Sequence, residues 1–189
     1  MKKIYSLITV FLLACSTSFG QVEIKLWDNG TQSGTGNNLN GAEHIYLVST
    51  DGPHYITINF RNISGTAKTW KMERYRIMDA VLWEDSFSWG IPGDPLSGQC
   101  YASGQMNTNP WMSPDMSGLT VASGESANMV VDTYTEGTGT EKYRYYLIEG
   151  QSTRVDSVDV VVFTSVLEVE DSQKQEMFVS VYPNPASNV

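Results

Sequence analysis

The stretch His54-Tyr55-Ile56-Thr57-Ile58-Asn59-Phe60-Arg61 alternates regularly between apolar and polar side chains. Successive side chains of an extended strand point to opposite faces, so residues 56, 58 and 60 form an apolar face. Residues 55, 57 and 59 lie on the opposite, polar face. This pattern predicts a β-strand that buries one side in a core and exposes the other to solvent.

The same period of two recurs along most of the chain, and no window shows apolar residues at helical spacing over three turns. The expected strands are residues 22–27, 44–49, 54–61, 68–78, 126–134, 142–148 and 157–164. Short strands separated by Gly, Ser, Asn and Asp clusters are typical of two packed antiparallel sheets. The sequence therefore predicts an all-β sandwich over residues 21–165.

Residues 84–118 interrupt this rhythm with closely spaced glycines and prolines, and they contain no strand of convincing length. We interpret the segment as one long loop, which in a compact domain is commonly functional. It is rich in aromatic residues, which disordered segments avoid. Trp83, Trp89, Tyr101 and Trp111 are the candidate binding residues, and we expect some of them to form an exposed row.

The composition limits the classes of partner. The 189 residues include 12 Lys and Arg against 21 Asp and Glu, a formal net charge of −9. Binding to nucleic acid or to an anionic membrane needs clustered cations, and the longest basic run is a pair of lysines. Hydrophobic residues make up 41% of the chain and charged residues 17%, which suits a folded core. We therefore expect no nucleic-acid partner.

The amino-terminal end resembles a secretory signal peptide over residues 1–20. A short basic start precedes the apolar run of residues 7–14, which is too short to span a bilayer. Small residues before the junction predict cleavage between Gly20 and Gln21. An alternative is a lipobox that would make Cys15 a lipid-anchored amino terminus. Cys15 is lost in the first case and lipidated in the second, so Cys100 remains without an intramolecular partner, and no transmembrane segment is expected.

The carboxyl-terminal end carries a second motif. Residues 166–176 are polar and acidic, as expected of a linker, and a strand-like run follows them. The run ends in Tyr182-Pro183-Asn184-Pro185, which resembles the opening of the type A carboxy-terminal sorting domain of Bacteroidetes type IX secretion cargo. This resemblance implies the type IX machinery as a partner and a secreted or cell-surface location. A complete sorting domain continues for several more strands, so we expect residues 177–189 to be a truncated start of one.

Two weaker resemblances concern the middle of the chain. Residues 119–126 resemble a phrase of immunoglobulin-like and fibronectin-like modules in which a strand returns as a hairpin. This resemblance implies that the antiparallel sandwich is immunoglobulin-like. Residues 87–90 and 98–101 resemble domains of other type IX cargo proteins. In those domains a cysteine often stands at the position of Ser88, which implies a bridge to the equivalent of Cys100 that this chain does not make.

Two chemical alternatives remain beside a noncatalytic module. Thiol and thioether sulfurs favour Cu(I), and such groups lie within a short span at Cys100, Met106, Met112 and Met116. A carbohydrate-active enzyme would use carboxylate pairs beside aromatic rings, with Glu84 and Asp85 or Asp94 and Asp115 as candidates.

Other polar clusters have simpler explanations. His44 and His54 are expected to face each other across a hairpin, where two imidazoles alone make a poor metal site. Residues 28–30 and 37–40 are rich in oxygen ligands for calcium, although turn chemistry accounts for them. We predict an exported binding or structural module without cofactor, resident metal or catalytic residues, whose ligand is a carbohydrate or a protein at the cell surface.

Overall fold

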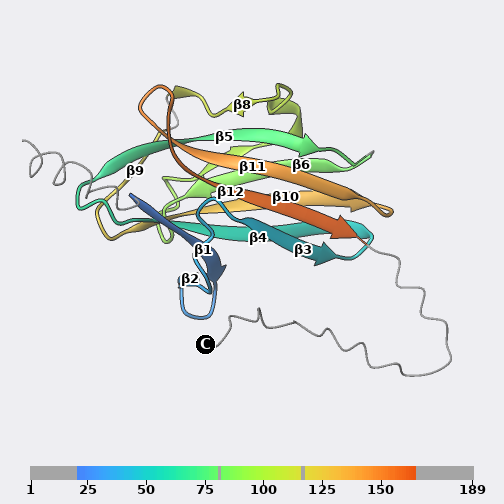
Figure 1. Ribbon diagram of the computed structural model, residues 1–189, viewed down its shortest axis with the longest axis horizontal. Coiled ribbons are helices and arrows are strands. Elements are labelled where there is room, and N and C mark those ends of the chain that lie inside the picture. The colour runs from blue at the N-terminus through green and yellow to red at the C-terminus, as the bar shows by residue number, and fades with distance from the viewer. Residues whose placement is uncertain (1–20, 81, 116–117, 165–189) are drawn as a thin grey trace, which may run out of the picture.

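The protein is described by a computed structural model that covers residues 21–80, 82–115 and 118–164. The predicted signal peptide, linker and sorting motif, including Gly20 and Tyr182 to Pro185, lie outside the described residues, as does Met116. The described part of the chain forms two β-sheets packed face to face (Figure 1). None of its helices is long and apolar enough to cross a membrane.

Sheet A has six strands. Their spatial order is β2 (Ser33–Thr35), β1 (Val22–Asp28), β4 (Asp51–Asn62), β10 (Ser126–Glu136), β6 (Glu84–Gly90) and β7 (Gln99–Tyr101). Every neighbouring pair in this sheet is antiparallel.

Sheet B also has six strands. Its order is β3 (Glu43–Val48), β12 (Thr153–Thr164), β11 (Thr140–Glu149), β5 (Lys68–Met78) and β8 (Trp111–Met112), with β9 (Leu119–Val121) also paired to β5. One pair departs from the antiparallel expectation, because β3 runs parallel to β12. A short 3-10 helix, Ser103–Gln105, lies between β7 and β8.

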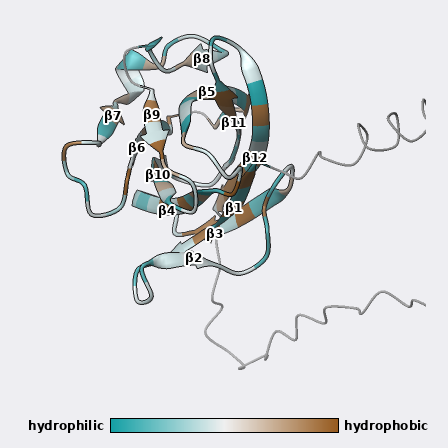
Figure 2. Ribbon diagram, turned by 90° about the vertical axis from the view of Figure 1, so that its left-hand side faces the viewer, coloured by the Kyte–Doolittle hydropathy of each residue, from teal (hydrophilic) through white to brown (hydrophobic). Residues whose placement is uncertain are grey.

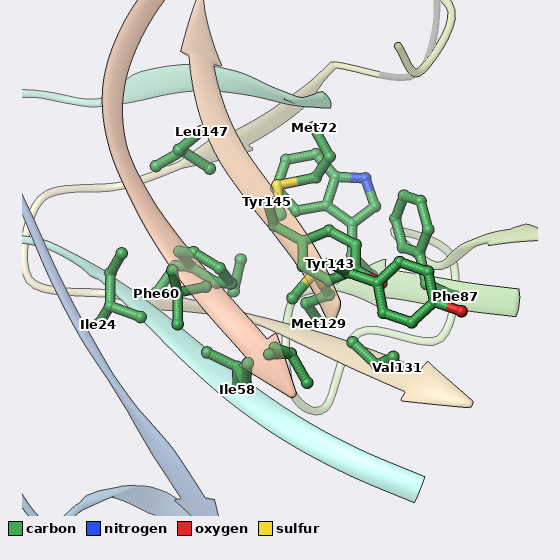
Figure 3. Close-up of a cluster of buried hydrophobic side chains, with 14 of the residues drawn as sticks. Ile24, Ile58, Phe60, Met72, Phe87, Met129, Val131, Tyr143, Tyr145 and Leu147 are labelled. Carbon is green, nitrogen blue, oxygen red and sulfur yellow. The ribbon is translucent and has the colours of Figure 1, made fainter. Parts of the chain in front are cut away.

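The core fills the space between the sheets. Hydrophobic and hydrophilic residues alternate along the strands (Figure 2). Most of the apolar residues of the long strands are buried between the sheets. Ile58 and Phe60 of β4 and Met129 and Val131 of β10 meet the rings of Tyr143 and Tyr145 from β11 in this layer (Figure 3). The predicted immunoglobulin-like β-sandwich is therefore confirmed, and all seven expected strands are present.

The expected single loop over residues 84–118 is wrong in part. Glu84–Gly90 is a full strand, paired with β10, and β7 and β8 follow it. The hydrophobic pattern of the sequence does not reveal this strand, because Asp85 occupies an inward position that an apolar residue would normally hold. Asp85 is tolerated there because two arginines neutralise it.

The hairpin expected at residues 119–126 is also wrong. Leu119–Val121 pairs with β5 of sheet B, whereas Ser126–Glu136 pairs with β4 and β6 of sheet A. The turn with Gly124 therefore carries the chain from one sheet to the other. Gly124 has a φ of +83°, a conformation that glycine adopts without a steric penalty.

Candidate functional site

The four aromatic residues singled out from the sequence are core residues. Trp83, Trp89, Tyr101 and Trp111 each expose 8% of their surface or less. The ring of Tyr101 packs edge-on against Trp111 at 4.8 Å between centroids and lies 5.1 Å from the ring of Phe87. The expected exposed row is contradicted, because all four side chains belong to the hydrophobic core.

Trp27 is the one tryptophan of the five in the chain that is not buried. In β1 the side chains of Val22, Ile24 and Leu26 point into the core. Glu23, Lys25 and Trp27 alternate with them and therefore lie on the outer face of sheet A, the side away from sheet B. Trp27 is half-buried there, whereas side chains on the outer face of a sheet are usually exposed to solvent.

A hollow of about 390 Å³ lies over this outer face and has Trp27 in its lining. The other lining residues are Glu23, Lys25, Gln32, Ser33, Gly34, Asn59, Arg61, Ile91, Pro92, Gly124, Glu125 and Ser126. Its volume suits a small ligand or one or two units of a polymer. We call it the Trp27 hollow.

Two projecting segments wall the Trp27 hollow. On one side the chain turns after β1 and returns as β2, which pairs only with the second half of β1. On the other side is the loop between β6 and β7, which supplies Ile91 and Pro92. Both segments project from the body of the sandwich in Figure 2. The sheet thus forms the floor of the hollow and the two segments form its sides.

Asn59 anchors the floor of the Trp27 hollow. It points to the outer face but is only 2% exposed, because β2 covers it. Its side-chain Nδ2 donates a hydrogen bond to Oδ1 of Asn128 on the neighbouring strand at 2.7 Å. This bond fixes the orientation of the amide group and places a polar side chain rigidly at the bottom of the hollow.

The charges around the Trp27 hollow are balanced. Lys25 pairs with Glu23 at 2.9 Å, and Glu125 accompanies Arg61 in the lining. The Nε of Arg61 donates to the backbone oxygen of Gly124 at 3.2 Å, a bond that leaves the terminal guanidinium nitrogens for other acceptors. Balanced charge, a partly exposed indole and directed polar groups favour a neutral polar ligand over a strongly charged one.

The sulfur atoms proposed as copper ligands face different surroundings. Met106 is buried, and its sulfur accepts a hydrogen bond from the Arg74 guanidinium at 3.6 Å. Cys100 and Met112 are exposed and belong to different sheets. A cation beside the Met106 sulfur disfavours a bound metal ion. Among the described residues no group of three His, Cys, Asp or Glu side chains could hold a metal ion.

The carboxylates proposed for hydrolysis also have other partners. Glu84 and Asp85 are consecutive in a strand and point to opposite faces. Asp85 accepts from Arg74 Nη1 at 2.6 Å and from Arg76 Nη2 at 2.9 Å. Asp94 accepts from the backbone N–H of Leu96, while Asp115 pairs with Lys71.

The structure does not support the expected histidine pair, and the calcium-ligand candidates make other contacts. His44 lies on β3 of sheet B and His54 on β4 of sheet A, so the expected hairpin between them does not form.

The Asp28 carboxylate accepts from the backbone N–H of Gly30 and the hydroxyl of Thr31, which lowers its pKa. Asn38 and Asn40 accept from the backbone N–H of Ile24. These contacts stabilise turns and edges.

Ser88 and Cys100 stand directly opposite each other on β6 and β7. This is the pair of positions that the resemblance to domains of type IX cargo proteins would join by a disulfide. Cys100 is exposed and free in this chain.

A scan of protein-family models finds no match to the chain, and no curated protein matches its sequence. Among solved structures, it is similar to the N-terminal domain of PorA, with a TM-score of 0.45 and 16% identity over 76% of this chain and 97% of that one. The seventh ScaB type I cohesin of Pseudobacteroides cellulosolvens gives a TM-score of 0.39 and 8% identity over 82% and 98% of the two chains. A PapD-like domain of a human protein gives a TM-score of 0.35 and 12% identity over 80% of this chain and 88% of that one. At such identities the likeness concerns the fold alone.

Proposed function

We propose that this chain is an exported, noncatalytic binding module that recognises a neutral carbohydrate in the Trp27 hollow. The observation that carries the proposal is the placement of Trp27. It is the one tryptophan held outside the core, and it lines a hollow of about 390 Å³ whose floor is a buried, hydrogen-bonded asparagine. Sugar rings offer apolar C–H faces to an indole and hydroxyl groups to amide and guanidinium groups.

The surroundings of the carboxylates support a noncatalytic role. Asp85 is held between two arginines in the interior, and Glu23 is paired with Lys25 at the hollow. A glycosidase of the common type needs two carboxyl groups that flank one bond, one of them able to donate a proton. The hollow combines Glu23 and Glu125 with two cations instead, an arrangement that suits binding.

The test is affinity electrophoresis through gels that contain single soluble polysaccharides. Neutral glucan, xylan and mannan are compared with anionic alginate for wild type, Trp27→Ala and Phe163→Ala. Phe163 is a matched control, because it is an exposed aromatic residue on sheet B. We expect at least one neutral polymer to retard wild type and Phe163→Ala but not Trp27→Ala. Equal migration of all three proteins in every gel would refute the proposal.

The proposal places the module outside the cytoplasm, as the residues before Gln21 and the motif at Tyr182 to Pro185 suggest. Both segments can be tested in a Bacteroidetes host that carries a type IX system. Intact-mass analysis of the medium and surface fractions should find a chain that starts at Gln21. A chain retained in the periplasm, or one lipidated at Cys15, would contradict type IX export and leave the binding proposal untouched.

A further inference from the structure

A second hollow, of about 320 Å³, lies on the same outer face of sheet A. Its lining includes Tyr55 from β4, Val130 and Asp132 from β10, Ser88 from β6 and Cys100 from β7. All of these side chains alternate with core residues and point away from sheet B. We call it the Tyr55 hollow.

The strand register shows that the two hollows are adjacent. Asn59, in the floor of the Trp27 hollow, lies opposite Asn128. The next outward pair along the same two strands is Thr57 with Val130, and the one after it is Tyr55 with Asp132. Outward positions on a strand are about 7 Å apart, so Tyr55 lies roughly 14 Å along β4 from Asn59. That span is longer than one sugar ring.

Exposed aromatic rings continue along this face. Tyr55 is 65% exposed, and Tyr134, on the next outward position of β10 after Asp132, is 53% exposed. Single exposed apolar residues are ordinary, but Trp27, Tyr55 and Tyr134 occupy one face while the other four tryptophans are buried.

The charges of the face limit the kind of polymer. The Trp27 hollow is balanced, and the Tyr55 hollow contributes Asp132 but no lysine or arginine. The whole chain is acidic, with a formal net charge of −9. A polyanion would be repelled by this face.

On the basis of the proposed function, we propose that the outer face of sheet A binds a linear neutral polysaccharide across both hollows. The Trp27 hollow is the primary subsite, and the Tyr55 hollow receives the following sugar units. The ligand is thus a polymer chain that crosses strands β1, β4, β10 and β6.

The test is the dependence of affinity on ligand length. Isothermal titration would use oligosaccharides of the polymer that retards wild type, from the monosaccharide to the hexasaccharide. We expect affinity to rise by about tenfold or more between the disaccharide and the tetrasaccharide, as the second subsite is filled. Tyr55→Ala should remove this rise, whereas Phe163→Ala should keep it. Tyr55 is well exposed, so its removal leaves the core intact.

The outcomes separate the two proposals. Affinity that is independent of length and insensitive to Tyr55→Ala, with Trp27→Ala still damaging, would overturn the polymer inference and keep a single small-ligand hollow. If the wild-type protein binds none of the saccharides, both the proposed function and the polymer inference are overturned. Retention by alginate alone, or by an extended protein such as denatured casein alone, would also refute the neutral polysaccharide.

Discussion

Gly34 of β2 lies against the side chain of Asn59 in the floor of the Trp27 hollow. A Cβ atom at Gly34 would come within 3.0 Å of Oδ1 of Asn59 and 3.1 Å of Cβ of Lys25. Gly34 is also the partner of Trp27 in the β1–β2 pair. The absence of a side chain at residue 34 therefore sets how closely β2 covers the sheet, and with it the position of the indole.

Gly34→Ala should weaken saccharide binding by about tenfold, because the new methyl group pushes β2 and Trp27 outward. The matched control is Gly104→Ala, since a Cβ at Gly104 meets nothing within 4 Å. Affinity electrophoresis measures the effect, and urea denaturation checks the fold. Equal affinities for the two variants would show that the packing of β2 does not shape the site.

Asp85 is the centre of a buried ion pair network. It is 2% exposed and accepts from Arg74 and Arg76, while Asp79 at the surface pairs with Arg76 alone at 3.2 Å. Removing the charge of Asp85 leaves the buried Arg74 guanidinium without a counter-charge. Asp85→Asn should lower the free energy of unfolding by about 3–5 kcal/mol.

The control for this change is Asp79→Asn, which removes an exposed pair and should cost less than about 1 kcal/mol. Urea denaturation followed by tryptophan fluorescence measures both variants. Similar small losses for the two substitutions would mean that the interior network contributes little to stability.

Glu141 makes stability dependent on pH. Burial is the largest cause that raises its pKa from 4.5 to about 7; the charges of Asp85 and Asp79 act in the same direction, opposed by the Tyr143 hydrogen bond and by Arg76. Below pH 4.5 the carboxyl group is protonated in both the folded and the unfolded chain. Between about pH 4.5 and 7 the unfolded chain releases this proton while the folded chain keeps it. Stability therefore falls as the pH rises through this window.

Glu141→Gln removes this titration and can keep a hydrogen bond with the Tyr143 hydroxyl. Relative to wild type, the variant should gain up to about 3 kcal/mol in the free energy of unfolding between pH 5 and pH 8. Urea denaturation at a series of pH values gives this difference directly. A constant difference between the two proteins across the series would show that folding does not shift the pKa of Glu141.

Ser88→Cys should form a disulfide with Cys100, because the two residues are cross-strand partners on β6 and β7. The bridge would close a short loop and add up to about 3 kcal/mol of stability under oxidising conditions. Thiol titration and denaturation with and without reductant measure it.

The control is Ser86→Cys, which is one outward position further along β6 and so diagonal to Cys100. Diagonal partners are roughly 7–8 Å apart, too far for a disulfide. Bridging in both variants, or in neither, would argue against the register of β6 and β7.

The sequence predicts the long strands well, because their alternation is uninterrupted. The pattern fails at β6, because Asp85 holds an inward position there. The charge of Asp85 is tolerated in the interior because Arg74 of β5 pairs with it. The pattern also fails at β2, β7, β8 and β9, which have two or three residues each and are too short to show a period. Their pairing is set by tertiary contacts.

The candidate site is harder to predict from the sequence than the fold. The Gly- and Pro-rich segment and its flank predict exposed tryptophans, but Trp83, Trp89 and Trp111 are buried. The signal for Trp27 is present in the sequence, since Trp27 falls in register with Glu23 and Lys25 on the polar side of β1. What the sequence does not contain is the cover of β2 that turns this position into a hollow.

The most direct measurement is acrylamide quenching of tryptophan fluorescence during titration with soluble neutral glucan, xylan and mannan. Trp27 is the one tryptophan that is not buried, so the quenchable emission comes mainly from its indole. We predict that one of these polymers lowers the quenching constant in a saturable way. Quenching that stays unchanged at saturating concentrations of all three would contradict carbohydrate binding in the Trp27 hollow.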